Sequence, residues 1–77
     1  MRRNMYTLSA NFDQLLIDAA KSITGFARKI GMNHTTLVRV RQRGNASAAT
    51  AERIAHQYAK LTSTDASDAL HKLFVLN

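Results

Sequence analysis

The sequence predicts an all-α fold, a compact domain of five helices. The chain has 77 residues, a length that suits one small domain. It contains no proline and only three glycines, too few for a sheet with many tight turns. Its apolar fraction of 45% is typical of a folded domain, and the apolar residues recur at helical spacing. Because there is no cysteine, helix packing or oligomerisation must stabilise the fold in place of disulfides.

The N-terminal part of the chain is expected to contain an arm and a first helix. Residues 1–10 show no clear period, so we expect them to form a flexible arm. Asn11 then suits the N-cap of a helix, and Gln14 stands in the capping-box position. The apolar stripe of this helix consists of Phe12, Leu15, Leu16, Ala19, Ala20 and Ile23.

Two short helices joined by a tight turn are expected next. Ser22 is the N-cap of the first, and Gly31 ends it in the left-handed conformation that glycine tolerates. Asn33 is the N-cap of the second, which stops near Gly44. The residues that these two helices turn inward are Phe26, Ala27, Ile30, Leu37 and Val40.

The fourth helix is expected to start at Ser47, and the fifth lies within residues 62–77 and opens with Asp65. The inner face of the fourth helix consists of Ala51, Ile54, Ala55, Tyr58 and Leu61. The apolar residues at the C-terminus have two alternative roles, closing the monomer core over the first helix or pairing with a second copy. Since the chain has no room for a separate oligomerisation domain, we favour a dimer contact through Leu70, Leu73, Phe74 and Leu76.

The charge of the chain indicates a polyanionic partner. Eleven Lys and Arg residues against five Asp and Glu residues give a net charge of +6. Between Ala19 and Ala51 the chain carries six basic residues and no acidic one; the six are Lys21, Arg28, Lys29, Arg39, Arg41 and Arg43. A solvated helical face usually mixes both signs, so this window predicts a binding surface.

Several classes of protein are disfavoured. The longest run of large apolar residues, Leu73 to Leu76, is too short to cross a membrane, and polar residues follow the basic start of the chain. We therefore expect a cytoplasmic, nucleoid-associated protein. The sequence shows no glycine-rich phosphate-binding loop and no recognisable set of catalytic residues, so we do not expect an enzyme. The three histidines lack ligand spacing, and we expect no metal, cofactor or small-molecule ligand.

The two short helices and the turn between them match a helix-turn-helix, in which Gly31 permits the turn and a small Ala27 lets the helices cross closely. The stretch from Ser22 to Leu61 resembles the Cro/cI-type repressors, the xenobiotic-response-element family of phage and bacterial regulators. The residues that carry the resemblance are Phe26-Ala27, Ile30-Gly31-Met32-Asn33, Thr36-Leu37, Arg39-Val40 and Ile54-Ala55. The resemblance implies a λ-repressor-like domain and a transcriptional repressor that binds a palindromic operator in double-stranded DNA as a homodimer.

The helix at residues 34–43 is the one expected to enter the major groove. On a helical wheel, Leu37 and Val40 face the core, and the polar and basic side chains face outward. The expected base-reading residues are His34, Thr35, Val38, Arg39 and Gln42. The expected contacts to the DNA backbone are Ser22, Thr24, Arg28, Thr36, Arg41, Arg43 and Asn45.

A second function is open to the same sequence. The chain could be the antitoxin of a toxin–antitoxin pair, which uses this fold to repress its own promoter. In that case the C-terminal apolar strip would dock a toxin rather than a second copy.

Overall fold

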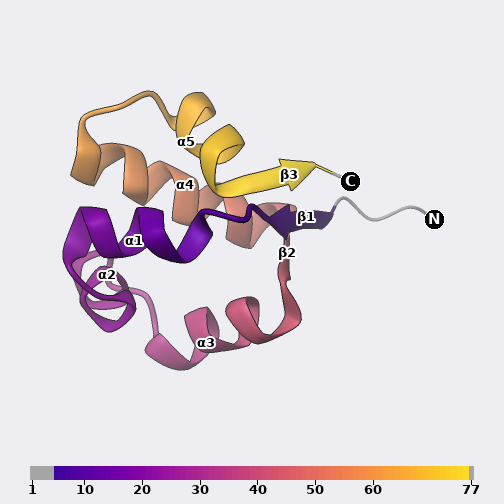
Figure 1. Cartoon of the computed structure of the whole chain (residues 1–77), viewed down its shortest axis with the longest axis horizontal. Coiled ribbons are helices and arrows are strands. Elements are labelled where there is room, and N and C mark those ends of the chain that lie inside the picture. Colours follow the sequence, from indigo (N-terminus) through magenta and orange to yellow (C-terminus); the bar gives the residue numbers. More distant parts are fainter. Residues whose placement is uncertain (1–4, 77) are drawn as a thin grey trace.

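The computed structural model of the chain describes residues 5–76; residues 1–4 of the predicted arm lie outside the described residues. Five helices and three short strands follow one another along the chain (Figure 1). In order, they are β1 (Met5–Leu8), α1 (Phe12–Ala20), α2 (Ile23–Lys29), α3 (His34–Arg43), β2 (Asn45–Ser47), α4 (Ala48–Thr62), α5 (Ala66–Leu73) and β3 (Phe74–Leu76). The prediction of five helices is confirmed, and the prediction of an all-α fold is wrong because a small sheet is present.

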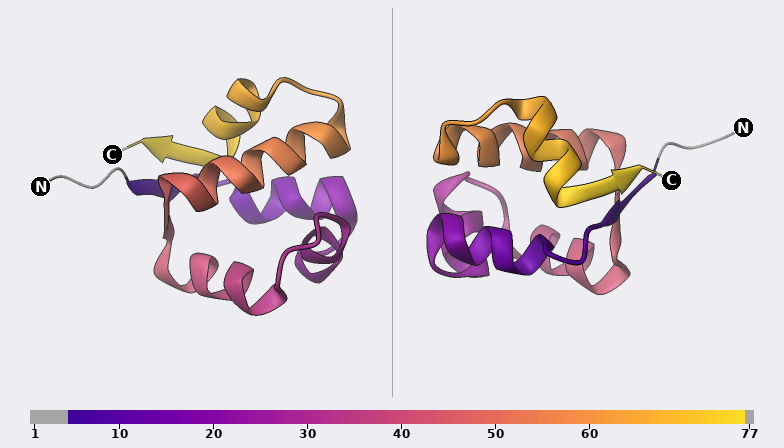
Figure 2. Two further views of the ribbon diagram at one scale, coloured as in Figure 1. Left: turned by 180° about the vertical axis from the view of Figure 1, so that it is seen from behind. Right: turned by 45° about the horizontal axis from the view of Figure 1, so that its top comes forward.

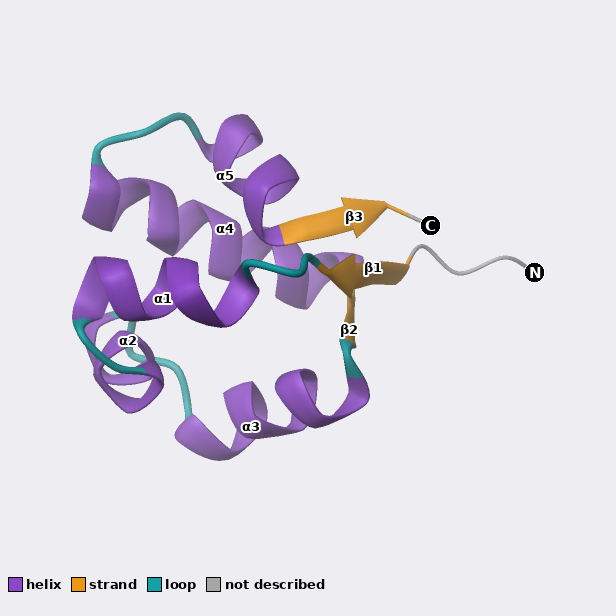
Figure 3. Ribbon diagram, viewed as in Figure 1, coloured by secondary structure: helices purple, strands orange, loops and turns teal. Residues whose placement is uncertain are grey.

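The three strands form one antiparallel sheet in the order β2-β1-β3. Tyr6 in the centre of β1 is opposite Ala46 on one side and Leu76 on the other. The strands gather at one side of the helices (Figure 3). Residues 5–8, which we expected in a flexible arm, are therefore the central strand. Four residues are too few to show an alternating pattern, and their partners are far along the chain, so the sequence carries no local signal for this strand.

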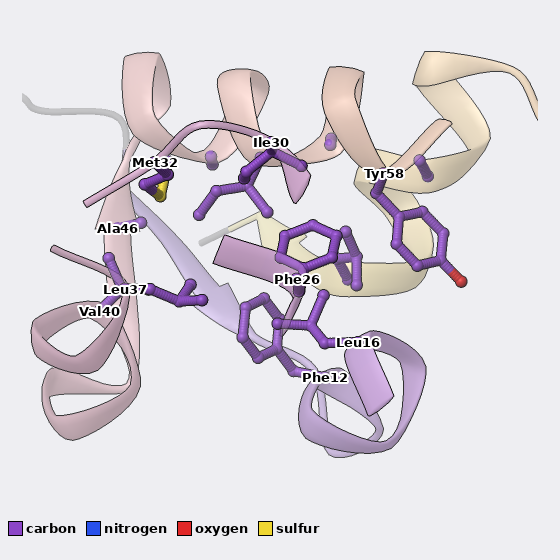
Figure 4. Packing of buried hydrophobic residues seen from close by; sticks show 14 of the residues in the cluster. Phe12, Leu16, Phe26, Ile30, Met32, Leu37, Val40, Ala46 and Tyr58 are labelled. Carbon is purple, nitrogen blue, oxygen red and sulfur yellow. The ribbon is translucent and has the colours of Figure 1, made fainter. Parts of the chain in front are cut away.

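The hydrophobic core lies between the helices and is sealed on one side by the sheet. Its largest fully buried side chains are Phe12, Leu16, Phe26, Leu37, Ile54 and Leu73, several of which appear in Figure 4. The predicted inner face of α4 is buried except for Leu61, which is 38% exposed. Leu61 lies in the last turn of α4, where the chain turns away through Ser63 in the left-handed conformation (φ 57°).

The C-terminal segment is divided between a helix and a strand. Leu73 ends α5 and is fully buried, and Phe74 begins β3 at 2% exposure. The Phe74 ring lies 5.5 Å from the ring of Phe12 and 6.1 Å from that of Tyr6. Of the two roles considered for this strip, closing the core over α1 is the one that these two side chains perform, and a dimer contact through the strip stays a prediction. Leu70 is partly buried against the same core.

Candidate nucleic-acid interface

The connection between α2 and α3 is a tight turn from Ile30 to Asn33. Gly31 has a φ of 69°, and an added Cβ there would meet no atom within 4 Å. Glycine is therefore favoured by the backbone conformation rather than by lack of space. The amide of Met32 donates to the carbonyl oxygen of Ala27 at 2.9 Å, and both side chains are buried. The turn is thus fixed to the core on one side and leaves α3 on the surface.

Both short helices start at the predicted residues. The Ser22 Oγ accepts a hydrogen bond from the amide of Gly25 at 2.8 Å, and the Asn33 Oδ1 accepts one from the amide of Thr35 at 2.8 Å. Ser22, which we expected at the DNA backbone, therefore already serves as an N-cap. Gly25 also allows a close approach of α1 to α2, since an added Cβ would lie 2.7 Å from the carbonyl oxygen of Ala20.

The helix α3 rests on the core by one face and exposes the other. Leu37 is fully buried and Val40 is 7% exposed, as the wheel predicts. The opposite face carries Thr35, Arg39 and Gln42, and His34 and Arg43 lie on its flanks; all five are exposed, and the remaining expected base reader, Val38, is half-buried. The views in Figure 2 place α3 along the edge of the molecule away from α5. No acidic residue occurs in α3.

A groove of about 330 Å³ runs beside α3, between this helix, β2 and the first turn of α4. Arg39 and Arg43 line it together with Thr36 and Asn45. Three of the expected backbone contacts and one expected base reader are thus brought to one place. The groove also contains residues that the sequence did not indicate, Met5, Ser47 and Thr50. They come from β1, from the end of β2 and from the first turn of α4, and the positions of Met5 and Ser47 depend on the sheet.

Arg41 has a partner that the sequence did not indicate. Its Nε donates to one carboxylate oxygen of Asp13 at 2.9 Å, and its Nη2 donates to the other at 2.8 Å. This hydrogen bonding is the main cause that lowers the pKa of Asp13 and raises the pKa of Arg41. Asp13 lies on α1, outside the acid-free window of the sequence, but the fold places it against that window.

The other residues expected to contact DNA differ in whether their side chains contact a partner within the protein. Thr24 Oγ1 lies 3.2 Å from His34 Nε2, so the first turns of α2 and α3 are joined by a hydrogen bond between two expected DNA contacts. Arg28 is exposed in the last turn of α2, with Lys29 beside it. Within residues 5–76, Asp13–Arg41 is the only ion pair. Apart from Arg41, the basic residues of the window therefore keep their charge uncompensated by a contacting carboxylate.

Comparisons with known protein families, with curated proteins and with solved structures find no match. Within the described part of the chain, no helix is both long and apolar enough to cross a membrane. The same residues contain no cluster of three or more metal-ligating side chains.

Proposed function

We propose that this protein is a sequence-specific transcriptional repressor that binds double-stranded DNA. In this proposal α2 and α3 act as a helix-turn-helix, as in the Cro/cI-type repressors that the sequence resembles, and α3 enters the major groove. The observation that carries the proposal is the outer face of α3, which is exposed, rich in polar and basic side chains, and free of acidic ones. The major groove of B-DNA, about 12 Å wide, admits a helix, and its base edges offer donors and acceptors to such side chains.

We propose roles for individual residues from where they lie. Arg39 lies nearly opposite the buried Leu37 around the helix, so we propose that it reads a guanine edge, with Thr35 and Gln42 beside it. Arg43 and Asn45 lie in the groove at the C-terminal end of α3, where we propose that they bind a backbone phosphate. Exposed basic residues on α2, Arg28 among them, add to the attraction.

We further propose that the repressor acts as a homodimer on a palindromic operator, because two-fold symmetry lets each copy read one half-site. The contact between the copies must avoid Leu73 and Phe74, which are used in the core. The strand β3 lies at one edge of the sheet, and its Val75 is 55% exposed. We propose this edge as the surface that a second copy uses.

The antitoxin function is not favoured by any specific observation. It depended on an exposed apolar strip at the C-terminus, and two of the side chains in that strip are buried in the core. A groove of about 290 Å³ between α4 and α5 is lined by Glu52, Ala55, His56, Ala66, Ser67 and Leu70. Its lining mixes polar and apolar side chains and does not identify a protein partner.

A salt titration of DNA binding tests the proposed function. If a dimer neutralises about eight phosphates, log affinity should fall with log salt concentration at a slope of about −7. The measurement is fluorescence anisotropy of labelled duplex DNA at several concentrations of potassium chloride. A flat response, or no binding at low salt, contradicts the proposal.

A further inference from the structure

The ion pair between Asp13 and Arg41 joins α1 to the helix that we propose enters DNA. It is bidentate, with both carboxylate oxygens engaged at 2.8 and 2.9 Å. Bidentate pairs of arginine and carboxylate fix geometry as well as adding energy. The Arg41 side chain is 36% exposed and the Asp13 side chain is 54% exposed, so the pair adds little to overall stability. Its main effect is therefore expected in the orientation of α3.

The other contacts of α3 hold its two ends and its inner face. Leu37 and Val40 hold one line of the helix against the core. At its C-terminal end, the carbonyl oxygen of Gly44 accepts a hydrogen bond from the amide of Leu8 at 2.9 Å, which ties the end of the helix to β1. At its N-terminal end, His34 Nε2 lies 3.2 Å from Thr24 Oγ1, which joins the first turns of α3 and α2. In the C-terminal half of α3, the described side-chain bond that holds the flank of the helix is the one made by Arg41, and it limits the roll of this half about the helix axis.

Arg41 occupies such a flank. At about 100° per residue, it lies roughly 40° from Leu37 around the helix, whereas Arg39 lies roughly 160° from Leu37. Arg41 is therefore on the inner flank, turned toward α1, and Arg39 is on the outer face. A bond from this flank to the carboxylate of Asp13 fixes the angle at which the outer face is presented.

We propose that Asp13 is a positioning residue for DNA recognition, which binds Arg41, fixes the roll of α3 and withdraws Arg41 from the phosphate contacts. This inference rests on the proposed function, since it concerns how α3 reads bases. It differs from the expectation that Arg41 itself holds the DNA backbone. The two roles make opposite predictions for the loss of the Asp13 carboxylate.

Replacement of Asp13 by asparagine tests the inference. If Asp13 positions α3, Asp13→Asn lowers the affinity for the operator by about fivefold or more, the lower end of what one base contact contributes. Affinity for non-specific DNA changes only as much as in Asp18→Asn, a matched control that removes the same charge from the same helix. If Arg41 instead serves a phosphate, Asp13→Asn frees it, and affinity for both DNAs rises.

Two further variants distinguish the roles by salt dependence and by rescue. With a positioning role, Arg41→Ala lowers operator affinity and leaves the salt slope unchanged, and the exchanged pair Asp13→Arg with Arg41→Asp restores most of the loss. With a phosphate contact, Arg41→Ala reduces the magnitude of the slope by about 0.9 per copy, and the exchange restores nothing. Circular dichroism of each variant establishes that the helices are formed.

Failure of this inference is distinguishable from failure of the proposed function. Wild-type protein that binds no DNA overturns the function. Wild-type protein that binds an operator, together with an Asp13→Asn variant of equal or higher affinity, overturns the positioning role alone. Hydrogen exchange of the free protein gives a readout without DNA: the amides of α3 should exchange faster in Asp13→Asn than in Asp18→Asn, and equal rates contradict the inference.

Discussion

At the scale of single residues, the charges of this protein take their roles from the fold. Asp13 and Arg41 are 28 positions apart, yet they form the only ion pair within the described residues. Arg39 and Arg43, one turn apart on α3, line a groove with no carboxylate among its residues. Neighbouring arginines of one short helix are therefore divided between a structural contact and a surface that can attract an anion.

The Asp13–Arg41 pair predicts a pH dependence of stability. Because hydrogen bonding from Arg41 lowers the pKa of Asp13, the carboxylate contributes stability that is fully present above its ordinary pKa of 3.8 and is lost as the pH falls through the lower value of the folded state. Asp13→Asn should therefore cost about 0.5–1 kcal/mol of unfolding free energy at pH 7, and the cost should be smaller at pH 2, below the ordinary pKa of the carboxyl group. Urea unfolding at both pH values measures this difference. A cost that is the same at both would show that the charge is not responsible.

The sequence could not reveal this pair in advance. The acid-free window from Ala19 to Ala51 is a property of the chain, and Asp13 precedes it. Only the fold brings the carboxylate of Asp13 on α1 to Arg41 on α3. In contrast, the buried positions Leu37 and Val40 were predictable, because helical periodicity is local.

At the scale of elements, helix starts were predictable because each is set by a side chain close by in the sequence. Ser22, Asn33, Ser47 and Asp65 each accept a hydrogen bond from an amide two or three residues on. Asn11 occupies the N-cap of α1 without such a bond. Strands were not predictable, because β1 and β3 pair residues from the two ends of the chain. Elements that are set by residues close together in the sequence were thus predicted, and elements that depend on residues far apart were not.

The helix α3 carries the prediction that separates base reading from phosphate binding. Arg39→Ala should weaken operator binding by about 1–3 kcal/mol and relax the preference at one base position, with little change on non-specific DNA. Arg43→Ala, a matched change one turn away, should weaken binding to all sequences alike and reduce the magnitude of the salt slope by about 0.9 per copy. Competition titrations with operator and random duplexes measure both effects. Indistinguishable variants would contradict the division of roles.

At the scale of the whole molecule, the sheet joins the two ends of the chain and closes the core. The central strand β1 pairs with β2, directly after α3, and with β3, directly after α5. Phe74 packs between the rings of Phe12 and Tyr6, so the C-terminal strand contributes to the same core as α1. The end of α3 is tied to the same sheet, because the carbonyl oxygen of Gly44 accepts a hydrogen bond from the amide of Leu8 in β1.

This closure predicts how the C-terminus responds to truncated side chains. Phe74→Ala should lower the unfolding free energy by about 3–5 kcal/mol, because it leaves a cavity in the core. Val75→Ala, at an exposed neighbouring position, should change stability by no more than about 0.5 kcal/mol and should weaken self-association. Chemical denaturation and sedimentation measure the two properties. A Phe74→Ala variant that keeps its stability and loses only self-association would contradict the core role and show that Phe74 belongs to a dimer contact.

The central claim, that the exposed face of α3 reads DNA sequence, is tested most directly by selection of bound duplexes from a random DNA library. We predict enrichment of one two-fold symmetric site, with half-site centres separated by about 10 base pairs or a multiple of that, and a change at one position of each half-site when Arg39→Ala is selected in parallel. Bound sequences that remain indistinguishable from the starting library, with wild type and variant alike, would contradict the claim.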